Sequence, residues 1–438
     1  MRVRATGSRR TVFAALVMTG ALTGALALSA CGANEDDGSN DKSQVEVFSW
    51  WTGPGEADGL KAMQADFEKK NSGTKFVNAA IAGGSGTQAK AVLASRLQNR
   101  KPPDSFQGHA GAELLDYIKA GQIEPLDGFY QQNNLKSVYP QQLIDQITYQ
   151  GKIYSVPVNI HRSNVLWYNP GILKDAGVAG PPKSIAEFVT ALKAVKDKTK
   201  KVPLSLGAQW TADHLLENVL LGDLGTDAYN ALWKPGADWS TPAVTRALND
   251  FAEIMKYTTL EAASTDWQGA AKAVVDGKAA FNVMGDWAYG YFVGNAPNGL
   301  GKKLDTDFKY AAAPGTEGTY MWLSDSFTLP KGAPHKAGAE AWLKEVSSKE
   351  GQDLFNPKKG SIPARKDADK SLYTGYLQDA FEQWNNPGTK LAGSFWHGVN
   401  ANNKWHTDID TAVGLFLQSR DAAKLQQGLV SAAKNSGL

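Results

Sequence analysis

Cys31 is the only cysteine among 438 residues, so no intramolecular disulfide can support this chain and the fold must rest on its own core. It ends a stretch that is built like a signal peptide. Four arginines come first, the apolar run 12–28 follows, and the segment closes on the lipobox pattern Leu28-Ser29-Ala30-Cys31. We therefore predict that residues 1–30 are a lipoprotein signal peptide and that Cys31 is the lipidation site.

Two other interpretations of the N-terminus stay open, a transmembrane anchor and an ordinary cleaved signal. The run 12–28 is short for a membrane span and contains Gly20 and Gly24, which disfavours spanning. Residues 31–44 are polar and acidic, which is typical of a flexible tether. We expect an exported chain that is held by lipid on the outer face of a bacterial cytoplasmic membrane.

The rest of the chain alternates between strand and helix patterns. Residues 45–50 form an apolar run, Leu60, Met63 and Phe67 recur at helical spacing, and 75–81 is strand-like again. The alternation predicts an α/β fold, and about 400 residues are enough for two domains. Removing the four signal arginines takes the formal charge from +2 to −2, so no basic footprint for nucleic acid remains.

Motifs for enzymatic cofactors are weak. Gly84, Gly86 and Ala89 spell GxGxxA with Asp104 further on, but the favoured interpretation is a glycine loop that enters a helix, well placed to approach a ligand. Ser85 lacks the GxSxG spacing of a nucleophile elbow. The six histidines show neither HExxH nor a tight Cys/His cluster. We expect no cofactor and no metal.

Acidic residues give no specific catalytic signal either. His214 and Glu217 can share a helix face, where a solvated polar pair is the favoured interpretation. Paired carboxylates for glycoside hydrolysis stay an open alternative, because no pair stands out among the 44 acidic residues.

Aromatic residues at expected strand ends carry a stronger signal. The chain has 13 tryptophans and 14 tyrosines, more than packing usually needs. Trp50 and Trp51 stand where the first strand ends, and alternation predicts one indole in the core and the other toward a cleft. Trp287 follows a strand that ends at Met284. Flat rings suit the C–H faces of a sugar, whose hydroxyls bond to Asp, Lys, His and Asn.

Several separated segments form a recognisable series: Phe48-Ser49-Trp50-Trp51, Pro102-Pro103-Asp104, 151–157, 166–169, 277–281 with 285–287, and 360–365. In this order and behind a lipobox, they resemble the extracellular solute-binding proteins of carbohydrate ABC transporters, in the maltose-binding-like family. The resemblance runs from about Val45 to the C-terminus. It implies a periplasmic-binding-protein-like α/β fold with two lobes, a hinge crossed three times, and a ligand cleft between the lobes.

The same resemblance gives expected boundaries. The crossings should fall near 158–163, 281–284 and 326–330. Lobe one then holds 45–158 and 283–327, and lobe two holds 159–282 and 328–438.

Within the family, the chain looks most like the glucose/galactose- and mannose-type sugar-binding proteins. That likeness implies ligand-facing residues at Trp51, His109, Trp267, Trp287, Asp325, Lys359 and His397, with Trp50, Gln107 and Asn159 in second place. Lys358 is adjacent to Lys359, and either could point inward. Trp287 could instead belong to the core, and His161 is expected to structure the hinge.

These features lead to two hypotheses from different classes. The first is a non-catalytic, high-affinity receptor that captures a monosaccharide by hinge closure and delivers it to the membrane subunits of an ABC importer. We expect this receptor to be a monomer. The second is a membrane-tethered carbohydrate-active enzyme such as a glycosidase, which would also be rich in tryptophan. A barrel glycosidase needs eight strand-helix units, whereas the segments above match a two-lobed binder. We favour the receptor.

Overall fold

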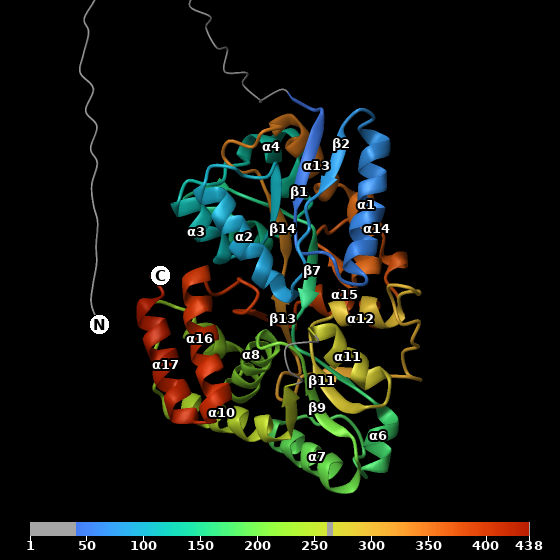
Figure 1. Cartoon of the computed structure of the whole chain (residues 1–438), viewed down its shortest axis with the longest axis vertical. Coiled ribbons are helices and arrows are strands. Elements are labelled where there is room, and N and C mark those ends of the chain that lie inside the picture. Colours follow the sequence, from blue (N-terminus) through green and yellow to red (C-terminus); the bar gives the residue numbers. More distant parts are fainter. Residues whose placement is uncertain (1–40, 261–265, 438) are drawn as a thin grey trace, which may run out of the picture. The chain divides into compact units, whose positions relative to one another are not determined.

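The structure is a computed structural model that describes residues 41–260 and 266–437. The predicted signal peptide, Cys31 and most of the predicted tether lie outside the described residues. Within the described part, strands and helices form two α/β lobes, and a further sheet lies between them (Figure 1). The two-lobed α/β fold implied by the resemblance is confirmed.

The first lobe is built on a five-stranded sheet with the order β2-β1-β3-β14-β6. Its strands are β1 (Gln44–Phe48), β2 (Lys75–Asn78), β3 (Ser105–His109), β6 (Val156–Pro157) and β14 (Asp325–Thr328). Strand β1 pairs in parallel with β2 and β3, whereas β14 runs antiparallel to β3 and β6. The first residue of β14, Asp325, is thereby placed opposite the last residue of β3, His109.

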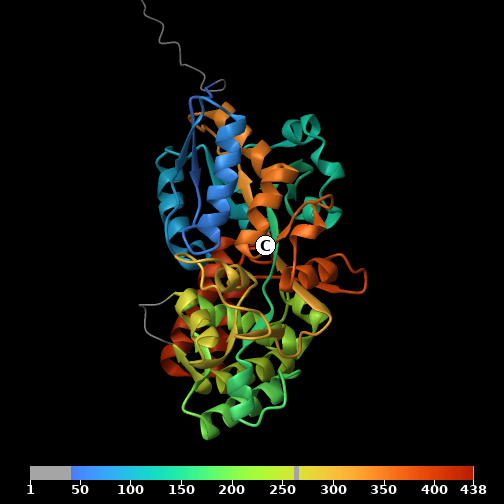
Figure 2. The ribbon, with the colours of Figure 1, turned by 90° about the vertical axis from the view of Figure 1, so that its right-hand side faces the viewer.

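Helices cover this sheet, namely α1 (Glu56–Lys70), α2 (Thr87–Gln98), α3 (Glu113–Lys119), α13 (Lys336–Ser347) and α14 (Lys349–Lys359). The apolar stripe predicted for α1 is confirmed, because Leu60, Met63 and Phe67 are buried. Helix α1 packs against α14, and Figure 2 shows the blue α1 beside the orange helices. Trp342 of α13 meets Phe67 edge to face.

The second lobe has a five-stranded sheet with the order β10-β9-β11-β8-β12. The strands are β8 (Val165–Tyr168), β9 (Val202–Leu206), β10 (Thr258–Leu260), β11 (Ala279–Val283) and β12 (Lys309–Ala312). Around them lie α7 (Ile185–Lys198), α8 (Trp210–Leu224), α10 (Pro242–Ile254), α11 (Trp267–Val275), α12 (Trp287–Val293), α16 (Asn403–Ser419) and α17 (Ala422–Asn435). Helices α8, α10, α16 and α17 pack against one another (Figure 1).

A four-stranded sheet with the order β15-β7-β13-β16 joins the lobes. Its strands are β7 (Asn159–Arg162), β13 (Thr319–Leu323), β15 (Ile362–Pro363) and β16 (Lys390–Gly393). The chain passes from β6 through β7 to β8, returns from β12 through β13 to β14, and leaves again after α14 through β15. Hinge strand β7 coincides with the first crossing that we expected, at 158–163.

Several segments differ from the expected division of the chain, among them α12, which was expected in lobe one and packs against α11 of the second lobe. Strand β11 at 281–284 does not cross but stays in the second sheet, because it pairs in parallel with β9. The return crossing is β13 instead, which lies antiparallel to β7. Strand β12, expected in lobe one, pairs with β8 of the second sheet, and α13 and α14, expected in lobe two, pack on the first lobe. The remaining lobe bounds stay a prediction.

The described chain also contains shorter α-helices and strands. They are α4 (Asp127–Gln132), α5 (Gln141–Gln146), α6 (Pro170–Asp175), α9 (Thr226–Leu232), α15 (Tyr376–Trp384), β4 (Thr148–Tyr149) and β5 (Lys152–Ile153).

Candidate functional site

A narrow cavity lies between the lobes, where strand ends and helix ends from both converge. Seven of the ten residues that we expected at a ligand site line it: Trp50, His109, Trp267, Trp287, Asp325, Lys359 and His397. Its free volume is about 30 Å³, enough for about two water molecules. A sugar therefore needs the lining groups to move apart, so this structure represents a contracted cleft.

The adjacent indoles after β1 have different surroundings. Trp50 lines the cavity, with its ring centroid 5.1 Å from that of His109. Trp51 packs between Phe327 and Phe355 and is 1% exposed. One indole thus faces the cavity and the other faces the core, as alternation predicts. The indole at the cavity is Trp50, which we ranked second, and not Trp51, which we ranked first. Trp51 does not line the cavity, because its own ring packs into the core.

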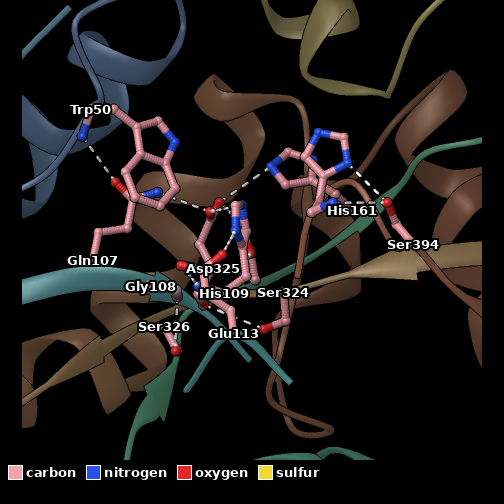
Figure 3. A network of polar contacts seen from close by, with 12 residues as sticks. Trp50, Gln107, Gly108, His109, Glu113, His161, Ser324, Asp325, Ser326 and Ser394 are labelled. Carbon is pink, nitrogen blue, oxygen red and sulfur yellow. Dashed lines mark hydrogen bonds and ion pairs between the residues drawn. The ribbon is translucent and has the colours of Figure 1, made fainter. Parts of the chain in front are cut away.

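Asp325 is the centre of a hydrogen-bond network at the first lobe's side of the cavity (Figure 3). Gln107 donates from Nε2 to its Oδ1 at 2.9 Å, and Asn159 donates from Nδ2 to its Oδ2 at 2.8 Å. Asn159 Oδ1 accepts the Asp325 backbone N–H at 2.8 Å. Gln107 and Asn159 do not line the cavity, and both act by fixing the orientation of the Asp325 carboxylate.

His109 is anchored through one nitrogen. Its Nδ1 lies 2.7 Å from Glu113 Oε2, and Lys90 Nζ donates to the same oxygen at 2.9 Å. Burial opposes ionisation of Glu113, but the charges of Lys90 and His109 outweigh it and hold the pKa of the carboxyl well below its usual range. The Glu113 carboxylate accepts the proton that His109 carries on Nδ1 and so fixes the orientation of the ring, with Nε2 3.8 Å from Asp325 Oδ1.

His161, on hinge strand β7, also lines the cavity. Its Nδ1 hydrogen-bonds to Asp286, whose other oxygen accepts the Arg162 backbone N–H at 2.8 Å. Burial lowers the pKa of His161 and raises that of Asp286. Both shifts favour the uncharged forms of the two side chains. His161 therefore combines the hinge role that we expected with a position beside the ligand space.

An ion pair closes another side of the cavity. Lys359, the last residue of α14, places Nζ 2.7 Å from Glu56 Oε1 at the start of α1. Of the two adjacent lysines, Lys359 lines the cavity, whereas Lys358 lines a surface groove. Glu56 was missed from the sequence, because an acid in the first turn of a helix is ordinary on electrostatic grounds. The loop before it, Thr52-Gly53-Pro54-Gly55, was the available signal.

The glycine loop of the first lobe touches the second lobe at this site. Gly84 donates its N–H to Asp266 Oδ2 at 2.6 Å, and Trp210 donates from Nε1 to Oδ1 at 2.7 Å. A Cβ at Gly84 would lie 2.5 Å from Trp210 Nε1, so this close approach requires glycine. Ser85 and Trp210 line the cavity and were not among the residues that we expected.

A cluster of buried polar side chains around Glu217 lies next to Trp210 and Trp287, which line the cavity. The expectation of a solvated His214–Glu217 pair was wrong, since both side chains are fully buried where α8 packs against the loop before α16. Ser163 and Ser394 donate to the Glu217 carboxylate at 2.7 and 2.8 Å. Ser394 Oγ is also 2.9 Å from His397 Nδ1. Burial raises the pKa of Glu217 to about 7, although these hydrogen bonds oppose the shift.

Residues 53–353 match the family model of the bacterial extracellular solute-binding proteins. The chain is 34% identical over 430 residues to an uncharacterized ABC transporter extracellular-binding protein of Pyrococcus horikoshii, which covers 96% of this chain and 95% of the relative. It is 31% identical to a probable sugar-binding periplasmic protein of Brucella suis, with 90% and 93% covered. A solved chitin oligosaccharide binding protein aligns with a TM-score of 0.77 at 18% identity, covering 90% of this chain and 98% of that one.

The fold and the inter-lobe site define a two-lobed binding protein. The chain belongs to the bacterial extracellular solute-binding protein family. Among residues 41–260 and 266–437, none of the helices combines the length and apolar character that crossing a membrane requires.

Proposed function

We propose that the protein is a high-affinity extracellular receptor that captures a monosaccharide of the glucose, galactose or mannose type and delivers it to an ABC importer. The observation that carries the proposal is the inter-lobe cavity itself, where indole rings stand beside Asp325, Lys359 and three anchored histidines. Rings suit the apolar faces of a pyranose, and the charged groups suit its hydroxyls. The sugar-binding description of the Brucella suis relative agrees with this chemistry.

The size of the sugar is a separate part of the proposal. With about 30 Å³ of free volume, the contracted cleft admits neither one ring nor several until the lobes separate, so the monosaccharide assignment rests on the likeness of the site residues to monosaccharide-binding relatives. The chitin oligosaccharide binding protein shares the fold but only 18% of the sequence, so its ligand class is a separate candidate. Titrating glucose, galactose, mannose, maltose and diacetylchitobiose by calorimetry separates the two classes. Tight binding of the disaccharides alone would reject the monosaccharide assignment.

Delivery depends on motion of the lobes about the hinge sheet. The ligand is held by groups from both lobes, so it stabilises the contracted cleft over the open one. Saturating monosaccharide should reduce the radius of gyration in solution and change tryptophan fluorescence, with one sugar per chain. Scattering without compaction at saturation would argue against capture by closure.

Membrane attachment completes the proposal. Lipidation of Cys31 would tether a monomeric receptor to the outer face of the bacterial cytoplasmic membrane, near the membrane subunits of the importer. Two acyl chains hold a protein stably, whereas one holds it only marginally.

The enzymatic alternative is less well supported by the cavity. A glycosidase needs one carboxylic acid that keeps a proton for the leaving group. The carboxyl groups that line the cavity, in Asp325 and Glu56, instead accept hydrogen bonds from amide and ammonium donors. Incubation with aryl glycosides and disaccharides tests this point, and product formation at a rate that scales with protein would favour the enzyme.

A further inference from the structure

The side chains beneath His397 form a continuous hydrogen-bond chain that no sequence motif indicated. His397 lines the cavity, its Nδ1 meets Ser394 Oγ at 2.9 Å, and that hydroxyl lies 2.9 and 2.8 Å from the two oxygens of Glu217. All three side chains are at most 3% exposed. Figure 3 shows a dashed line that joins Ser394 to an imidazole.

The direction of each hydrogen bond follows from counting protons. Ser394 has one hydroxyl proton, and an ionised Glu217 can only accept, so this proton points to the carboxylate. The hydroxyl oxygen is then free to accept, which it does from the His397 backbone N–H at 3.2 Å. Its contact with the imidazole must therefore use a proton on Nδ1. Neutral His397 is left with an unprotonated Nε2 for a ligand in the cavity.

Above its pKa of about 7, Glu217 is ionised, and other contacts also use it as an acceptor. Ser163 donates to Oε1 at 2.7 Å and the Trp396 backbone N–H donates to Oε2 at 3.2 Å. His214 Nδ1 lies 3.4 Å from Oε1. These donors face a carboxylate that has no ammonium or guanidinium partner among the described residues, so hydrogen bonds alone stabilise its charge.

The set of His214, Glu217 and His397 also brings metal-binding residue types within 4.8 Å of one another. The two serine hydroxyls already engage the carboxylate and the Nδ1 atom of His397, so the hydrogen-bond chain accounts for these groups without an ion.

We propose that Glu217 is a positioning residue for sugar recognition: acting through Ser394, it fixes the tautomer of His397 so that Nε2 accepts a hydrogen bond from a sugar hydroxyl. The inference rests on the proposed sugar-binding function and deepens it. It assigns a specificity role to a residue that does not touch the ligand. His397 would then distinguish a hydroxyl, which can donate, from a substituent of similar size that cannot.

Two variants break the chain at different links. In Glu217→Gln, whichever way the amide is turned, an N–H₂ group replaces one of the two oxygens that Ser394 contacts. Ser394 Oγ can then accept from that amide, and its proton is shared between the remaining amide oxygen and His397 Nδ1, which raises the population with the imidazole proton on Nε2. In Ser394→Ala the link is absent. Ser163→Ala is the matched control, because it removes a hydroxyl from Glu217 without breaking the path to His397.

The first measurement needs no sugar. Nitrogen chemical shifts of ¹⁵N-histidine-labelled protein at pH 8, above the pKa of about 7 for Glu217, report which nitrogen of His397 carries the proton. We expect the proton on Nδ1 in the parent protein and in Ser163→Ala, and a shift of the population toward Nε2 in Glu217→Gln and Ser394→Ala. A parent protein with the proton on Nε2, or an unchanged tautomer in both variants, would overturn the proposal.

The second measurement uses glucose and its monodeoxyfluoro analogues, because fluorine replaces a hydroxyl but cannot donate. At the ring position that faces His397, the parent protein should disfavour fluorine, and this penalty should shrink about threefold to tenfold in Glu217→Gln, the size of one neutral hydrogen bond. A general loss of stability would weaken all analogues alike, and that uniform result counts against the proposal. If the parent binds no monosaccharide, the proposed function fails, whereas the tautomer measurement still decides the role of Glu217.

Discussion

Asp325 offers the sharpest test of the sugar site, because it joins the ligand space to a defined internal network. Replacing it with alanine removes an ionised acceptor that we expect to bind sugar hydroxyls. A hydrogen bond to a charged group contributes about 1.5–3 kcal/mol, and each 1.4 kcal/mol corresponds to a tenfold change in the dissociation constant. Asp325→Ala should therefore weaken hexose binding by about 10-fold to 100-fold.

The same substitution has a separate effect on folding. Gln107 Nε2 and Asn159 Nδ2 both donate to Asp325, and alanine leaves these two buried donors without their acceptor. An unsatisfied buried polar group costs about 1–3 kcal/mol, with the lower end expected here because water can enter from the adjoining cavity. Asp325→Asn keeps the volume and one carbonyl oxygen, so it should lose affinity while lowering the melting temperature less than alanine does.

Calorimetric titration with glucose and galactose, beside melting curves of the same samples, separates the two effects. Glu68→Ala, on the exposed face of α1, is the control that should leave affinity unchanged. If folded Asp325→Ala binds hexose as the parent does and only its melting temperature falls, Asp325 merely holds Gln107 and Asn159. That result would remove it from the binding site.

Three further outcomes are expected. Cys31→Ala should release the protein from membranes or leave it unprocessed, and mature-sized variant that still fractionates with membranes would rule out lipidation. Gly84→Ala should weaken sugar binding without a large change in melting temperature, since its Cβ would clash with Trp210 only when the lobes approach; unchanged affinity by calorimetry would contradict this. Burial raises the pKa of Glu345 to about 7, above the ordinary value of 4.5. The folded protein therefore holds this proton more tightly than the unfolded chain, and its stability falls as pH rises from about 4.5 to about 7. Glu345→Gln should gain stability over the parent at pH 8 relative to pH 4 in denaturant titrations, and an equal difference at both pH values would refute the assignment.

Local patterns predicted local structure well. The buried stripe of α1 follows from helical spacing, and the split between Trp50 and Trp51 follows from strand alternation. Which of the two indoles faces the cavity depends on which one packs against Phe355 of α14. This contact belongs to the tertiary structure and cannot be read from local sequence. For the same reason the sequence could not show that α13 and α14 return to the first lobe.

The missed members of the site share a physical cause. Glu56 stands in a first helical turn, where an acid is ordinary, so only the approach of Lys359 from α14 identifies it. Glu217 and Ser394 are 177 residues apart, and no spacing rule links them. Polar residues in a helix are expected to face solvent, yet the serines and the Trp396 backbone N–H supply enough donors to bury this carboxylate. Such compensation is visible only once the loops are placed.

The arrangement also explains why a ligand should control closure. Contracting the cleft without sugar takes water away from Asp325 and from the Glu56–Lys359 pair, and desolvating charged groups is costly unless their hydrogen-bonding capacity is used. The internal amides satisfy part of the Asp325 carboxylate, and a sugar hydroxyl can satisfy the rest. The contact between Gly84 and Asp266 adds a hydrogen bond across the lobes. A ligand shifts an equilibrium only through its differential affinity for the two states. We therefore expect the polar groups that oppose closure of the empty cleft to be the same groups that make closure selective for sugar.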